Sequence, residues 1–160
     1  VGRPGMNDAY VVGQDVGDED TAKKAGMKFN VIDHVPGAFL KRTGGNMPEW
    51  VVRGTGVYLA AKQDSENLHV KEMRSRVPAM LASLAKPDDI FNDGTFSPSA
   101  VGAVGHALVE YMTKSSGGVQ RFDGFVRSLQ GGNNITAALK SIYQADTKAV
   151  SAAFVRSFRK

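Results

Sequence analysis

Cysteine is absent from the 160 residues, and long apolar stretches are absent as well. Without cysteine there is no disulfide, no thiolate-bound metal and no cysteine nucleophile. No apolar run approaches the roughly 18–20 residues that a membrane-spanning helix needs, so we expect no transmembrane segment. Aromatic residues make up only 8% of the chain, and no segment interleaves them with basic residues as base-stacking surfaces do. Nucleic acid is therefore not the favoured partner.

Charged residues are ordinary in number but uneven in their placement. Hydrophobic residues make up 42% and charged residues 22%, which is typical of a globular protein, and the length is that of one domain. The net charge is +4, yet residues 1–33 carry six acids against four bases, whereas residues 111–160 carry eight bases against two acids. A basic C-terminal part of this kind indicates either solvated helix faces or a contact with an anionic surface.

The residue pattern divides the single domain, residues 1–160, into two parts. Residues 1–46 are rich in glycine and acid and contain two short apolar stretches, 9–12 and 27–32, whose length favours strands. From residue 47 onward, apolar residues recur three and four positions apart, which predicts helices. The sequence therefore predicts a mainly α fold of the α+β type, with a helical part over residues 47–160 and any strands confined to the N-terminal part.

Cap residues and prolines indicate where the helices begin. Asn46 and Glu49 have the spacing of a capping box, and Pro48 falls in the first turn of the helix that follows. Pro78 interrupts a helical stretch over residues 68–84, so we expect a fresh helix to begin there. After a loop, further helices are expected over 98–114, 119–129 and 135–142, and following a cap at Asp146.

Three blocks of the sequence resemble the peptidase MA-like family of metallopeptidases, the gluzincins. They read DHVPGAFL at residues 33–40, MPEWVVRG at residues 47–54 and VYLA at residues 57–60, and the stretches between residues 107 and 142 follow the order of the family's helical tail. The resemblance implies a gluzincin-like domain whose C-terminal part is a helical bundle. Because members of that family are often exported, it also implies an extracytoplasmic protein, periplasmic or secreted.

The resemblance places the family's zinc site at Asp33, His34, Gly37 and Arg53. The family has histidine ligands at the positions of Asp33 and Gly37, a glutamate general base at that of His34, and a glutamate ligand at that of Arg53. Zinc peptidases need these imidazoles and carboxylates to hold the metal and activate its water. All four residues are replaced here, one of them by a cation. The resemblance therefore implies a degenerate member with no catalytic residue, no metal and no other cofactor.

Arg53 allows two interpretations. Its guanidinium could pair with Asp33 or Glu49, or hold an anionic ligand, in the place where the family binds zinc. Alternatively, Arg53 is a polar residue on the solvent side of the helix that carries Trp50. Beside a cation, Asp33 is expected to stay ionised at low pH. A metal site of Asp33, His34 and Glu49 is a further alternative, and Arg53, Glu49 and Trp50 are the candidate interaction residues.

Four other residues bear on the packing of the helices. Trp50 lies in the middle of an apolar helical stripe, so we expect it to be buried, and an exposed tryptophan anchoring an interface is the alternative. His106 is expected to be a hydrogen-bonded histidine of the core or the surface. Gly54 and Gly56 indicate close helix packing, because no strand precedes them as it would in a nucleotide-binding loop.

The residues and the resemblance together predict a non-catalytic binding or assembly module, a subunit or accessory protein whose partner is another protein. On balance, these observations favour a protein that is not an enzyme. The alternative is a zinc-dependent peptidase whose metal site is atypical or is completed by residues outside this chain. A third hypothesis is contact with an anionic polymer or membrane surface through the basic C-terminal helices, which salt would weaken.

Overall fold

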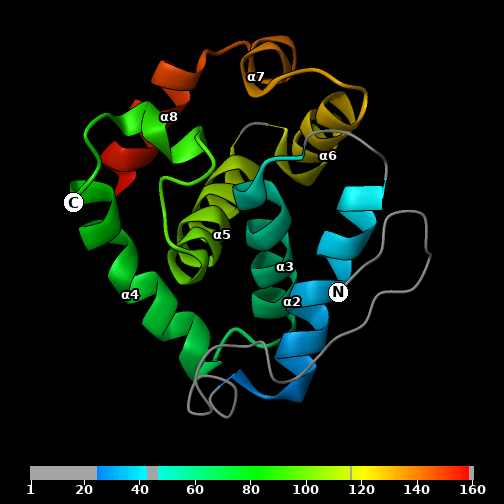
Figure 1. Cartoon of the computed structure of the whole chain (residues 1–160), viewed down its shortest axis with the longest axis vertical. Coiled ribbons are helices and arrows are strands. Elements are labelled where there is room, and N and C mark those ends of the chain that lie inside the picture. Colours follow the sequence, from blue (N-terminus) through cyan, green and yellow to red (C-terminus); the bar gives the residue numbers. More distant parts are fainter. Residues whose placement is uncertain (1–24, 43–46, 116, 159–160) are drawn as a thin grey trace.

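The computed structural model describes residues 25–42, 47–115 and 117–158, and these residues form helices joined by short loops, with no strand among them (Figure 1). The mainly α prediction is confirmed. The elements, labelled as in Figure 1, are α2 (Met27–Arg42), α3 (Glu49–Gln63), α4 (Leu68–Ala82), the 3₁₀ helix η1 (Pro87–Phe91), α5 (Pro98–Lys114), α6 (Gly118–Gln130), α7 (Ile135–Tyr143) and α8 (Thr147–Ser157). The helices expected after residue 97, including the Asp146 cap, are present.

The strand expected over residues 27–32 is wrong, because this stretch is the first part of α2. Phe29, Asp33 and Gly37 are buried at intervals of four residues, which is the helical period. Two of these three buried positions are an acid and a glycine, so hydrophobicity alone does not reveal the stripe. The other expected strand, 9–12, lies outside the described residues.

Two prolines lie in the interior of a helix. Pro36 lies within α2, and α4 continues through Pro78, so the fresh helix expected at Pro78 is wrong. A proline removes one backbone donor and leaves one carbonyl without its helical partner. Pro78 is exposed, so water can reach that carbonyl and the helix need not end.

The N-terminus of α3 is capped from a distant part of the chain. Pro48 is the cap residue, and the backbone N–H of Glu49 donates to Asp93 Oδ1 at 2.9 Å. Asn46, the cap that the sequence predicts, lies outside the described residues. Asp93, which accepts this hydrogen bond, belongs to the loop after η1 and lies 44 positions after Glu49 in the sequence. Its negative charge complements the positive end of the helix dipole.

Helices α3 and α5 lie side by side at the centre of the molecule (Figure 1). They meet at glycines: a Cβ on Gly105 would lie 2.5 Å from the backbone oxygen of Trp50, and one on Gly54 would overlap the backbone of Gly105. The close packing expected at Gly54 is therefore present. On the other side of α3 lies α2, while α4 and α6 pack against α5.

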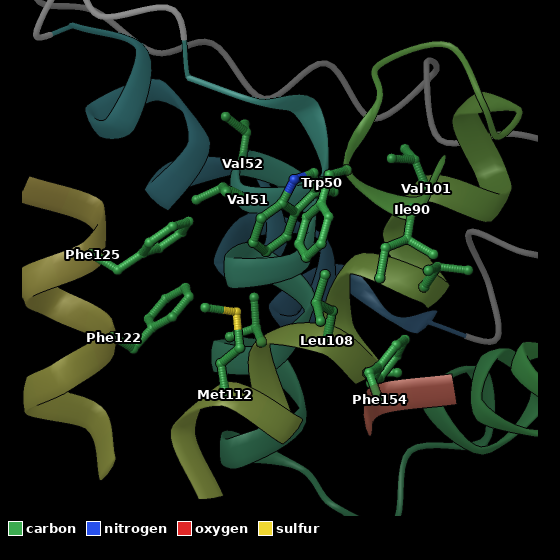
Figure 2. Close-up of a cluster of buried hydrophobic side chains, with 14 of the residues drawn as sticks. Trp50, Val51, Val52, Ile90, Val101, Leu108, Met112, Phe122, Phe125 and Phe154 are labelled. Atoms are coloured by element: carbon green, nitrogen blue, oxygen red, sulfur yellow. The ribbon is translucent and has the colours of Figure 1, made fainter. Parts of the chain in front are cut away.

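The core is built around Trp50, which is 2% exposed, as predicted. Its ring lies 5.8 Å from that of Phe91 in an edge arrangement and 6.0 Å from that of Phe125 in a stacked one, measured between centroids. Figure 2 shows Trp50 among side chains from α3, α5, α6, η1 and α8. Trp50 thus links α3 to η1 and α6, and burial of such a side chain contributes strongly to stability.

Candidate functional site

The structure brings the four predicted site positions together where α2 packs on α3. Asp33 and Gly37 lie one turn apart on α2 and face α3: a Cβ on Gly37 would be 2.9 Å from Val52 Cγ1, and one on Gly56 would overlap the backbone oxygen of Asp33. Glycine at these two positions therefore sets how closely the helices approach. We call Asp33, His34, Gly37 and Arg53 the α2–α3 site.

Arg53 joins the two helices through two polar contacts. Its Nη2 lies 3.4 Å from Asp33 Oδ2, and its Nη1 lies 3.4 Å from His34 Nε2. Of the interpretations that the sequence allows, the structure has the ion pair with Asp33. The Arg53 side chain is a third exposed, so the guanidinium lies at the edge of the interface with one side toward solvent.

The hydrogen bonds of His34 define its tautomer. Nδ1 lies 2.8 Å from the backbone oxygen of Asn30, and a carbonyl oxygen can only accept, so Nδ1 carries the hydrogen and donates it. Nε2 then carries the lone pair that accepts from Arg53 Nη1, because a guanidinium has no acceptor. In this arrangement both ring nitrogens are occupied within the protein.

Asp33 is a buried carboxyl, 5% exposed. Burial raises the pKa of Asp33 above its usual value, and the nearby Arg53, His34 and His69 offset only part of that effect. The expectation that Asp33 stays ionised at low pH is therefore wrong, because desolvation outweighs the neighbouring cation. Its Oδ1 also has no hydrogen-bond partner among the described residues.

The residues of the α2–α3 site do not fit a zinc ion. Gly37 has no side chain, both nitrogens of His34 are engaged, and Arg53 places a permanent cation 3.4 Å from the carboxylate of Asp33. Within the described ranges, no three histidine, aspartate or glutamate side chains come together as a metal site would require. The alternative metal site of Asp33, His34 and Glu49 is therefore wrong.

The two remaining candidate interaction residues lie near the start of α3. Trp50 belongs to the core, so its side chain adds nothing to a surface. Glu49 is partly exposed at the first position of the helix, where a negative charge is favourable. Of the three candidates, Arg53 and Glu49 are accessible.

A second polar cluster, between α4 and α5, was missed by sequence reasoning. Glu110 of α5 pairs with Arg74 of α4 and with Lys114, whose Nζ lies 2.9 Å from Glu110 Oε1. One turn before Glu110 lies His106, which is 1% exposed and whose Nδ1 has no partner among the described residues. We call Arg74, His106, Glu110 and Lys114 the α4–α5 cluster. The spacing of four along α5 was a visible signal, whereas the contact with Arg74 was not.

The charges of the α4–α5 cluster shift two pKa values. Burial lowers the pKa of His106 to about 4; Arg74 and Lys114 act in the same direction and Glu110 opposes them. Burial alone would raise the pKa of Glu110, but hydrogen bonds from Arg74 and Lys114 bring it down to about 2. His106 is therefore a core histidine, neutral at physiological pH, and its Nδ1 lacks a hydrogen-bond partner among the described residues.

No family model, curated protein or solved structure matches this chain. The resemblance to peptidase MA-like proteins therefore depends on the sequence blocks themselves. Among the described helices, none is both long and apolar enough to cross a bilayer.

Proposed function

We propose that this chain is a non-catalytic binding or assembly module, derived from a metallopeptidase-like fold that has lost its zinc site. The observation that carries the proposal is the position of Arg53, whose guanidinium contacts both Asp33 and His34 where the resembling family holds its metal. A guanidinium is not a metal ligand and stays charged at all ordinary pH values. The helices are then linked by an ion pair instead of by zinc.

The outer face of α2 supports a binding role. Val31 and Phe39, two turns apart, are 41% and 59% exposed, with the half-buried Val35 midway between them. The solvent face of a surface helix is ordinarily polar, so an apolar stripe there is typical of a contact surface. Exposed Lys28 and Lys41 flank it. A protein surface with apolar and acidic residues has the chemistry to bind this face.

Two weaker elements of the proposal follow from the sequence. The resemblance favours an extracytoplasmic location, periplasmic or secreted. The basic C-terminal part favours an additional contact with an anionic surface, for which Lys140, Lys148 and Arg156 are exposed on α7 and α8. Binding of that kind weakens steeply with added salt, whereas apolar contact through α2 does not.

The experiment has a catalytic arm and a binding arm. In the first, the chain is incubated with zinc and a pool of peptides, and mass spectrometry follows cleavage. We expect none; cleavage that a chelator abolishes would favour the zinc peptidase instead.

In the binding arm, the tagged chain is recovered from its native source after mild cross-linking, beside two folded variants. Phe39→Asp places a charge in the α2 stripe, and Leu68→Asp does the same at a residue 66% exposed on α4. We expect a stoichiometric protein partner that Phe39→Asp loses and Leu68→Asp keeps. Recovery of the chain alone, with no stoichiometric partner, would contradict the proposal.

A further inference from the structure

Helix α4 buries fewer residues than α3 and α5 do. It lies at the edge of the molecule in Figure 1 and packs chiefly against α5. Its buried residues are Val70, Val77 and Leu81, whereas α5 buries residues along almost its whole length. Elements that bury few apolar side chains open locally at lower free energy than the core. Among the described helices, α4 is thus a natural place for a local opening.

His106 lies on α5 one turn before Glu110, whose carboxylate pairs with Arg74 of α4. It is a fully buried imidazole whose Nδ1 has no partner among the described residues. The charges that act on it are those of Arg74 on α4 and of Glu110 and Lys114 on α5. Helix α3, on the adjoining face of α5, meets that helix through uncharged residues such as Gly54 and Val57.

We propose that α4 is an acid-released clasp: a proton on His106 favours a state in which α4 has moved away from α5 and the imidazole is hydrated. Two features support this. A buried imidazolium would lie among two cations and one carboxylate that is already paired with both of them. Opening would expose the apolar surface now covered by Val70, Val77 and Leu81, so acid would uncover a face that neutral pH conceals.

Linkage gives the size of the effect. The pKa of His106 is about 4 with α4 closed and returns to 6.5 when the ring is hydrated. The ratio of open to closed molecules therefore rises about 20-fold between pH 7 and pH 5. Glu110, with a pKa of about 2, stays ionised over this range, so its own protonation does not break the pair with Arg74. The response between pH 7 and pH 5 is thus attributed to His106.

Hydrogen exchange of the full chain, read by mass spectrometry as protection factors at pH 7 and pH 5, tests the clasp. We expect protection of α4 amides to be lower than that of α3 and α6 amides at both pH values and to fall about 20-fold between them. Protection of α4 equal to that of α3 and α6 at both pH values would mean that His106 is exposed only by global unfolding, and it would overturn the clasp. A change in α4 of less than about threefold would also overturn the proposal.

Two variants make the assignment specific. His106→Gln cannot take up a proton in this range, so its α4 protection should be the same at both pH values after correction for intrinsic exchange. Arg74→Ala removes an exposed side chain and should loosen α4 at both pH values; it should reduce the pH response but not abolish it, because burial is the main cause of the lowered His106 pKa. If His106→Gln retains the full response, another group causes it and the clasp does not work through His106. If His106→Gln fails to fold, the protection of α4 amides in the wild type and in Arg74→Ala at the two pH values still tests the proposal.

Discussion

The α2–α3 site and the α4–α5 cluster both place ionisable groups between packed helices, and acid acts on them in opposite directions. At the first, the buried group is an acid, Asp33. Its pKa is raised because protonation removes a charge that is unfavourable when buried. At the second, the buried group is a base, His106, whose lowered pKa means that protonation is resisted. A proton therefore stabilises the folded state at Asp33 and destabilises it at His106. The same loss of hydration causes both effects, because burial disfavours whichever form is charged.

The two interfaces also differ in what fills them. At the α2–α3 site, glycines let the backbones of the two helices approach closely, and the Asp33–Arg53 ion pair links them. Helix α4 instead contacts α5 through a few apolar residues and the Arg74–Glu110 ion pair. Close backbone approach makes the first interface intolerant of added atoms. We expect the α2–α3 interface to be rigid and the α4–α5 interface to be able to open. The following changes test that difference.

The largest effect is expected at Trp50, which ties α3 to the rest of the core. Trp50→Ala should reduce the free energy of unfolding by about 3–5 kcal/mol, the range for large aromatic deletions in packed cores. Leu68→Ala, at an exposed position of α4, should change it by less than about 0.5 kcal/mol. Denaturant titration measures both. Equal stability of wild type and Trp50→Ala would show that α3 is not the anchor of the core.

Gly56→Ala tests the close approach of α2 and α3. Its new Cβ would overlap the backbone oxygen of Asp33, which cannot rotate away, so we expect a loss of about 3 kcal/mol. Gly124→Ala is the matched control in α6, because its Cβ would lie 3.7 Å from Ile142 Cδ1, an ordinary contact. A gain in helix propensity should make that change neutral or slightly stabilising. If both variants have the same melting temperature, the interface is looser than described.

The pH dependence of unfolding separates the two regions. A lowered histidine pKa contributes stability that is full above pH 6.5 and is lost as pH falls toward about 4. Between pH 7 and pH 5 this loss amounts to about 2 kcal/mol, and His106→Gln should remove it. Asp33 acts with the other sign: its contribution is full below 3.8 and is lost as pH rises through the raised value. Asp33→Asn should therefore lose stability more steeply on acidification than wild type does.

The smallest effects compare the two arginines. Arg53→Ala leaves a buried carboxylate without its cation, but Asp33 can take up a proton instead, so the cost should be about 1–2 kcal/mol. Arg74→Ala should cost less than about 1 kcal/mol, because the Arg74 side chain is 46% exposed and Glu110 keeps its pair with Lys114. Thermal unfolding at pH 7 compares them. A larger loss for Arg74→Ala would reverse the ranking of the two interfaces.

Much of the fold could be predicted from the sequence, because α3 and α5 to α8 carry apolar stripes or caps that are local. Helix α2 could not, since two of its buried positions are Asp33 and Gly37, which hydrophobicity does not mark. The α3 cap on Asp93 depends on tertiary structure in the same way. At the site, the register of the resemblance placed Asp33 near Arg53, and the structure has them 3.4 Å apart. The sign of the Asp33 pKa shift was missed because desolvation depends on what covers a group.

The most direct test of the account is the zinc content of the purified chain, determined by elemental analysis after dialysis, for wild type and for Arg53→Glu. We expect well under one zinc per chain in both, because Arg53→Glu alone sets two carboxylates together without the histidines that zinc needs, and it should lower the melting temperature. Only the joint change Asp33→His, His34→Glu, Gly37→His and Arg53→Glu supplies the full set of ligands and base. Stoichiometric zinc in the wild-type chain that survives dialysis and raises the melting temperature would contradict the claim that Arg53 has replaced the metal.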